Sequence, residues 1–170
     1  MDCNCIRNNF DVSIQVVDFD TAIFTDTSDW MEEDGYTIPP SYNIQIQVPN
    51  SMVNQEITLV PGISVTVKGK DLSGLRDGVY LLSTTSCGKT YSRYKAIFPY
   101  MRCCLDQAWV ERYSQDKSQL LTIEQSLYLA TVKAELKDSK GSADFLDLAK
   151  RQLDNLKCDC KCNNYGVHFN

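Results

Sequence analysis

The sequence predicts an α+β protein in which an antiparallel β-sandwich is followed by an α-helical hairpin. Two observations carry this prediction. Apolar and polar residues alternate with period two as far as residue 98, as in half-buried strands, and from Pro99 onward the apolar period becomes 3.6, as in helices. We therefore divide the chain into a β-sandwich domain (1–98), a helical arm (99–157) and a Cys-rich C-terminal tail (158–170).

Six strands are expected in the first part of the chain. They are residues 10–17, 42–48, 56–60, 63–67, 79–85 and 91–98. Pro-Gly at 61–62 separates the third from the fourth, so these two can pair or can turn a corner between sheets, and the Gly-containing segment 86–90 closes a hairpin. Strands about ten residues apart, joined by Pro/Gly turns, are typical of an antiparallel sandwich.

Three helical segments are expected after the strands. Pro99 suits the first turn of a helix, whose apolar face carries Met101, Cys104, Leu105, Ala108 and Trp109. A second helix is expected from near Ser118 to Lys137, and a third from Ala143 to about Lys157. The break at 138–141, with Gly141 as the C-cap, is short enough to fold residues 118–157 into a helical hairpin.

Composition excludes several classes of function. With 170 residues, 43% of them apolar, the chain can bury a core, and its net charge of −5 argues against wrapping nucleic acid. No apolar run approaches the ~20 residues that span a bilayer, and the first residues lack the pattern of a signal peptide. His168 is the single histidine, so His-based catalysis has little to use, and we expect no enzyme.

The charge is divided unevenly along the chain. Residues 1–67 hold ten acids and one base, a net charge of −9, and residues 68–170 hold 12 acids and 16 bases, a net charge of +4. The acidic part is either a solvated loop or one side of a head-to-tail contact between copies. For the second case the expected interface joins Asp26, Asp29, Glu32, Glu33 and Asp34 to Arg102, Arg112, Lys133, Lys137 and Lys150.

Eight cysteines are the most unusual feature of the composition, and five of them lie in C-x-C spacing near the two ends. These five are Cys3, Cys5, Cys158, Cys160 and Cys162. If the termini meet, as domain termini often do, the thiolates can hold a structural zinc ion. Free thiols remain open as well, because C-x-C is not the common zinc-knuckle spacing. Disulfides also remain open: without a visible signal peptide they are not expected during synthesis, but a particle released from the cell can oxidise later.

The order of motifs also suggests a family. An Asp-Thr-Ser-Asp-Trp segment (26–30) precedes a Pro-flanked Ile/Val strand, 77–82 leads into the Lys/Arg/Tyr-rich run 89–99, and Arg-Cys-Cys-Leu-Asp (102–106) opens the helices. This pattern resembles the small ring or neck proteins of tailed bacteriophages, especially crAss-like phages. The resemblance implies a virion structural protein with an immunoglobulin-like sandwich, forming a ring between portal and tail.

The family would make the chain a head-to-tail connector, synthesised in the host cytoplasm and assembled with copies of itself and with portal, neck or tail proteins. The family has no catalytic motif, so the resemblance implies no catalytic residues in this sequence. The alternative from another class is a cytosolic metal-binding or redox protein built on the C-x-C clusters.

Overall fold

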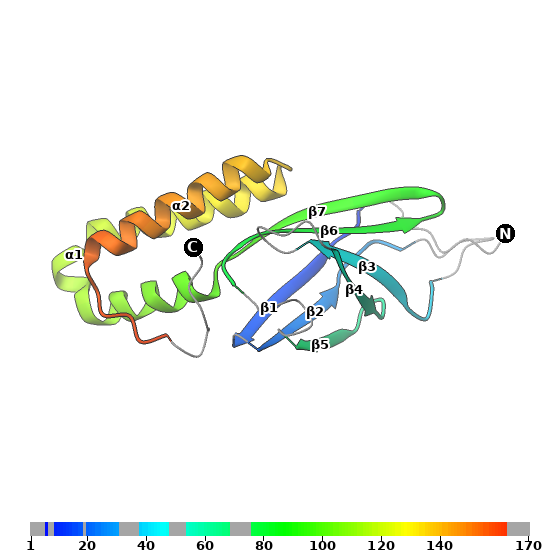
Figure 1. Cartoon of the computed structure of the whole chain (residues 1–170), viewed down its shortest axis with the longest axis horizontal. Coiled ribbons are helices and arrows are strands. Elements are labelled where there is room, and N and C mark those ends of the chain that lie inside the picture. Colours follow the sequence, from blue (N-terminus) through cyan, green and yellow to red (C-terminus); the bar gives the residue numbers. More distant parts are fainter. Residues whose placement is uncertain are drawn as a thin grey trace.

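The computed structural model describes residues 6, 9–18, 20–30, 38–47, 54–68 and 76–162. Within them, strands precede helices, and the α+β class is confirmed (Figure 1). The elements are β1 (Val12–Asp18), β2 (Thr21–Asp26), β3 (Tyr42–Gln47), β4 (Asn54–Leu59), β5 (Ser64–Lys68), β6 (Gly78–Ser86), β7 (Lys89–Ile97), α1 (Pro99–Glu135) and α2 (Ser139–Leu156).

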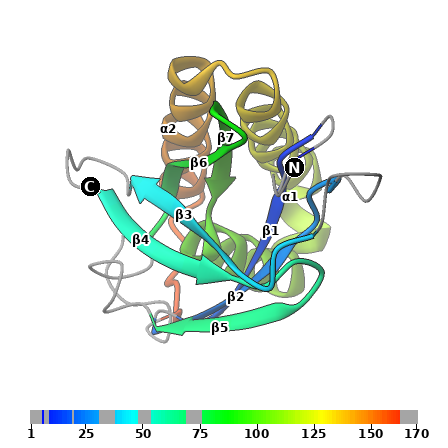
Figure 2. The same ribbon diagram turned by 90° about the vertical axis from the view of Figure 1, so that its right-hand side faces the viewer.

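The strands form two antiparallel sheets, ordered β1-β2-β5 and β4-β3-β6-β7. One apolar core joins them, with Phe24 and Val67 from the first sheet and Ile46, Leu59 and Tyr80 from the second. Period-two alternation explains this burial, because Ile44 and Ile46 lie inside while their neighbours on β3 do not. Figure 2 views the sheets from the end opposite the helices.

The structure settles one turn that the sequence left open and confirms another that it predicted. β4 and β5 belong to different sheets, so the Pro61-Gly62 turn crosses a corner instead of closing a hairpin. β6 and β7 do form a hairpin, paired from Gly78 and Ile97 to Ser86 and Lys89. Cys87 and Gly88 connect them with φ of 52° and 73°, the left-handed pair that a two-residue hairpin favours.

β2 is the strand that the sequence pattern did not predict, because the acidic residues around it indicated a solvated loop. The backbone N–H of Asp20 donates to the Asp18 carboxylate at 2.8 Å, so these acids form a tight turn. β2 then pairs with both β1 and β5 and lies at the centre of its sheet.

α1 is bent back on itself. The backbone of Asp116 is non-helical (φ −124°, ψ 21°), and the chain reverses there (Figure 1). Arg102 and Glu124 would lie about 33 Å apart along a straight helix. Instead, Arg102 Nη1 donates to Glu124 at 2.8 Å. Two antiparallel segments therefore make up α1, which agrees with the second helix expected from near Ser118.

The three helical segments share a second core. Its buried members are Met101, Leu105, Ala108, Leu120, Ile123, Leu127, Ala130, Leu146, Ala149 and Leu156. Val79 and Ala96, which pair across β6 and β7, pack against it together with Phe98. Since Tyr80 and Leu82 point into the sandwich core, the β6–β7 ribbon has the sandwich on one face and the helices on the other.

The connection between α1 and α2 differs from the expected one. α2 begins at Ser139, and the Asp138 side chain caps it by accepting from Gly141 N–H at 2.8 Å. Gly141 is therefore in the first turn of α2 and not a C-cap. A Cβ at this position would lie 2.4 Å from an Asp138 carboxylate oxygen, so a larger residue would require this carboxylate to shift. Neither described helix has a stretch apolar and uncharged enough to cross a lipid bilayer.

Asp77 joins the sandwich to the helices. It is 3% exposed, at the start of β6, and its carboxylate accepts from Tyr100 N–H and Met101 N–H at 2.9 Å each. These donors belong to the first turn of α1, where backbone N–H groups lack partners within the helix. Burial raises the pKa of Asp77 to about 6, although the two hydrogen bonds favour its charged form.

The raised pKa of Asp77 predicts a pH-dependent stability. Asp in an unfolded chain titrates near ~3.9, so between about pH 4 and pH 6 the folded chain binds the extra proton. The contribution of this group to the free energy of unfolding should therefore fall as pH rises through that window, by on the order of 2 kcal/mol, and stay constant above it.

Urea denaturation at pH 4, 5, 6 and 7 measures this effect as the difference between the unmodified chain and Asp77→Asn. That difference should be most favourable to the unmodified chain at pH 4. A difference that is constant across these pH values would show that Asp77 titrates normally.

Candidate functional site

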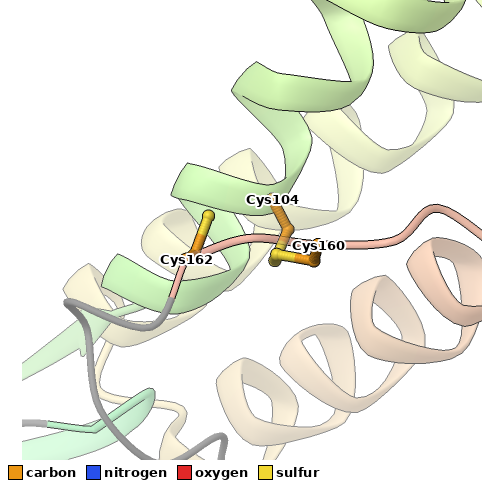
Figure 3. A group of neighbouring side chains, drawn as sticks. All are labelled: Cys104, Cys160 and Cys162. Atoms are coloured by element: carbon orange, nitrogen blue, oxygen red, sulfur yellow. A yellow bond between two sulfur atoms is a disulfide. The ribbon is translucent and has the colours of Figure 1, made fainter.

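The C-terminal segment lies along the first segment of α1 and is tied to it by two disulfides, of which Figure 3 shows the one between Cys104 and Cys160. Cys103 is bonded to Cys162, with their Cα atoms 6.1 Å apart, and Cys104 is bonded to Cys160, with a Cα distance of 5.4 Å. We call these four residues the cysteine clip. The two bonds lie side by side because Cys103 and Cys104 are adjacent in a helix and their partners are in C-x-C spacing.

Local structure directs the C-terminal segment to this place. α2 ends at the buried Leu156, and Lys157 takes a left-handed conformation (φ 55°) that turns the chain. Gln107 of α1 then holds the segment through its side-chain amide, which donates to the Asp159 carbonyl at 2.9 Å and accepts from Lys161 N–H at 3.1 Å. These hydrogen bonds do not involve the disulfides.

The sulfur atoms of Cys104, Cys160 and Cys162 all lie within 4.8 Å of one another. Cys104 and Cys162 are buried, at 7% and 0% exposure, and Cys160 is half-buried. Thiolates gathered in this way can bind a soft or borderline metal ion, and the same sulfurs are close enough to pair as disulfides. The site therefore supports either sulfur chemistry.

The structure brings together some of the five cysteines that the sequence singled out. Cys160 and Cys162 do come together, whereas Cys158 is a free, half-buried thiol that packs against the helical core. Cys3 and Cys5 lie outside the described residues. The sequence interpretation missed Cys103 and Cys104, the partners of Cys162 and Cys160. Two adjacent cysteines on one predicted helix were the signal that could have identified them.

An ion-pair network beside the clip ties the two segments of α1 together. Arg102 bonds to Glu124 and Asp106, and Trp109 Nε1 donates to Glu124 at 3.0 Å. The hydrogen bond with Glu124 raises the pKa of Arg102, and the same bond lowers the pKa of Glu124 below its usual value. The network leaves Arg102 engaged within its own chain.

The other bases expected at an interface are also placed by the structure. Arg112 pairs with Asp116 at 3.4 Å, and Lys133 reaches Asp138 at 3.7 Å. Lys137 is exposed, and Lys150 is half-buried and has an interaction partner. Arg102, Arg112 and Lys133 thus contact acids of the same chain, which reduces the basic charge that they present to a neighbour.

Asp26 does not belong to an exposed acidic surface, which corrects the sequence interpretation. It is 3% exposed and accepts hydrogen bonds from Trp30 Nε1 at 2.9 Å, Gly62 N–H at 3.2 Å and the Tyr42 hydroxyl. Burial raises the pKa of Tyr42, and the bond to Asp26 adds to that rise. Asp29 is exposed, and Glu32, Glu33 and Asp34 lie outside the described residues.

A pocket of about 400 Å³ lies between the sandwich and the first segment of α1. Ile14 and Val16 of β1 form one wall, and Phe98, Pro99 and Cys103 are among the residues of the other. The clip therefore borders a mainly apolar opening.

No protein-family model, curated protein or solved structure matches this chain. The arguments about function consequently start from the clip, the helical surface and the sequence pattern.

Proposed function

We propose that the chain is a non-enzymatic virion structural protein that forms a homo-oligomeric ring, the head-to-tail connector in the neck of a tailed phage. In this proposal the sandwich is an immunoglobulin-like body, and the helices reach neighbouring subunits. The protein is synthesised in the host cytoplasm and assembles with portal, neck or tail proteins. The order of sequence motifs supports this assignment, and the surface of the helices supports the oligomer.

The observation that carries the proposal is the apolar surface of the helical part. Val110 is 86% exposed, Leu136 69% and Tyr128 67%, and Tyr113 and Leu121 are each 51% exposed. Leu121 and Tyr128 are seven residues apart in the second segment of α1, so they lie two turns apart on the same side. Apolar side chains that share one side of an exposed helix can form a patch of the kind that another protein covers.

The proposal predicts that apolar contacts of α1 hold the oligomer together. Burying one large apolar side chain contributes about 1.5–3 kcal/mol, so the double variant Leu121→Asp/Tyr128→Asp should weaken self-association at least about 100-fold. Light scattering coupled to size-exclusion chromatography measures the mass of the purified chain and its variants. We expect a closed oligomer for the unmodified chain and a monomer for the double variant.

Ile63→Asp is the matched control, because Ile63 is 55% exposed in the turn between β4 and β5 and lies outside the helical part. It should leave the mass unchanged. Circular dichroism verifies that each variant keeps its fold. A monomeric unmodified chain, or a double variant of unchanged mass, contradicts the proposal.

Charge has a secondary role in this proposal. An exposed ion pair contributes only ~0.2–1 kcal/mol, so the −9 and +4 parts of the chain orient approaching subunits without supplying the affinity. Asp26 is buried and three of the expected bases are paired within the chain, so fewer of these charges are left to face a neighbouring subunit. A higher salt concentration should therefore slow assembly strongly, whereas it should dissociate preformed rings much less.

A second candidate function is metal binding or redox chemistry at the cysteines, with a structural zinc ion as the metal. The close approach of the Cys104, Cys160 and Cys162 sulfurs favours it. Native mass spectrometry separates the two functions, because a monomer with stoichiometric metal supports the second and a closed oligomer supports the first.

A further inference from the structure

We infer that the cysteine clip exchanges its two disulfides for one zinc ion, held by the thiolates of Cys103, Cys104, Cys160 and Cys162. This inference specifies the site of the second candidate function and does not depend on ring assembly. It also replaces the ligand set expected from the sequence, because Cys3, Cys5 and Cys158 are not in it.

The positions of the sulfurs carry the inference. Four thiolates at a Zn–S distance of about 2.3 Å lie roughly 3.8 Å from one another around a tetrahedral zinc ion. The sulfurs of Cys104, Cys160 and Cys162 are already within 4.8 Å of one another. Cys103 is outside that group but is bonded to Cys162. Once the two disulfides are open, the Cys103 sulfur is the one that has to move closer to the other three.

The clip keeps its shape without the sulfur bonds. Gln107 holds the segment through Asp159 and Lys161, and Leu156, 4% exposed, fixes the end of α2 in the helical core. After reduction the C-x-C pair therefore still faces Cys103 and Cys104. Outer contacts that orient ligands in this way commonly change metal affinity 10–100-fold when they are removed.

The chemistry of the four side chains suits zinc. A four-sulfur set selects zinc over the hard ions calcium and magnesium, which prefer oxygen ligands.

The exchange balances in two steps. Four equivalents of a low-molecular-weight thiol reduce the two protein disulfides, giving four cysteine thiols and two small-molecule disulfides. Zinc then binds the four thiols and releases four protons, so binding strengthens as pH rises. Oxidation by a small-molecule disulfide reverses both steps and releases the metal. The C-terminal segment thus stays joined to α1 in reducing and in oxidising surroundings.

The test uses the full chain, reduced without oxygen and titrated with zinc alone. We expect one zinc per chain by elemental analysis. We also expect zinc to protect Cys103, Cys104, Cys160 and Cys162 from alkylation while Cys158 reacts, as mapped by peptide mass spectrometry. Because it uses the unmodified chain, the mapping does not depend on whether a variant folds.

Variants give the second readout. Cys104→Ser and Cys160→Ser should each weaken zinc binding at least tenfold, whereas the matched control Cys158→Ser should leave it unchanged. Gln107→Ala keeps all four ligands and should weaken binding without changing the stoichiometry.

Failure to bind zinc, protection of Cys158 in place of a clip cysteine, or equal loss in Cys158→Ser would overturn the inference. Light scattering on the same samples measures the mass of the oligomer and so tests the ring proposal independently. Loss of zinc binding with an unchanged mass would overturn this inference and leave the ring proposal in place.

Discussion

Removing both disulfides of the clip should destabilise the protein by much more than removing either one. Each bond closes a long loop, with sequence separations of 59 and 56 residues, and a loop of that length corresponds to about 4 kcal/mol in the chain-entropy description. While one bond remains, the other closes only a few additional residues and contributes about 2 kcal/mol or less. The two bonds can therefore substitute for each other.

Denaturation in urea without reductant tests this double-mutant cycle. The paired variants Cys103→Ser/Cys162→Ser and Cys104→Ser/Cys160→Ser should each lose about 2 kcal/mol or less, and the quadruple variant should lose about 4 kcal/mol more than either pair. Cys158→Ser is the control and should change the free energy of unfolding little. Strictly additive losses would mean that the two bonds stabilise different parts of the chain.

Asp26→Ala should unfold the sandwich at much lower urea concentration than the unmodified chain. The substitution removes the common acceptor of Trp30, Tyr42 and Gly62, which are 4, 16 and 36 residues away in the sequence. Trp30 and Tyr42 are half-buried and Gly62 is exposed, so water can replace part of what these donors lose. A buried donor left without an acceptor costs about 1–3 kcal/mol, and we therefore expect a total loss of about 2–4 kcal/mol.

Glu56→Ala provides the comparison for Asp26→Ala. Glu56 is an exposed acid of the same sandwich whose carboxylate accepts from the Gln45 side chain at 2.8 Å, and its loss should change stability by about 0.5 kcal/mol or less. Equal effects of the two substitutions would mean that Asp26 behaves as a surface residue.

The periodic parts of the fold could be predicted from the sequence. Alternation along residues 42–47 and the 3.6 period after Pro99 depend on local patterns of burial, and the structure has β3 and α1 there. β2 was not predicted, because the acids on either side of it are typical of a solvated loop. In the structure Asp18 and Asp20 instead form the tight turn that leads into the strand.

The candidate site was only partly predictable, because its partners meet through tertiary structure. C-x-C spacing identified Cys160 and Cys162, but their pairing with Cys103 and Cys104 depends on the path of the chain after α2. Asp26 was misassigned for the same reason. A carboxylate is normally exposed, and here distant donors make its burial possible.

The β6–β7 ribbon has a mechanical consequence. Its Tyr80 and Leu82 are part of the sandwich core, while Val79 and Ala96 on the opposite face pack against the helices. In addition, Asp77 at the start of β6 accepts hydrogen bonds from the first turn of α1. Among the described residues, a force applied to the helical part therefore passes to the sandwich mainly through these two strands. Pulling on α2 should strain β6 and β7 before the β1-β2-β5 sheet.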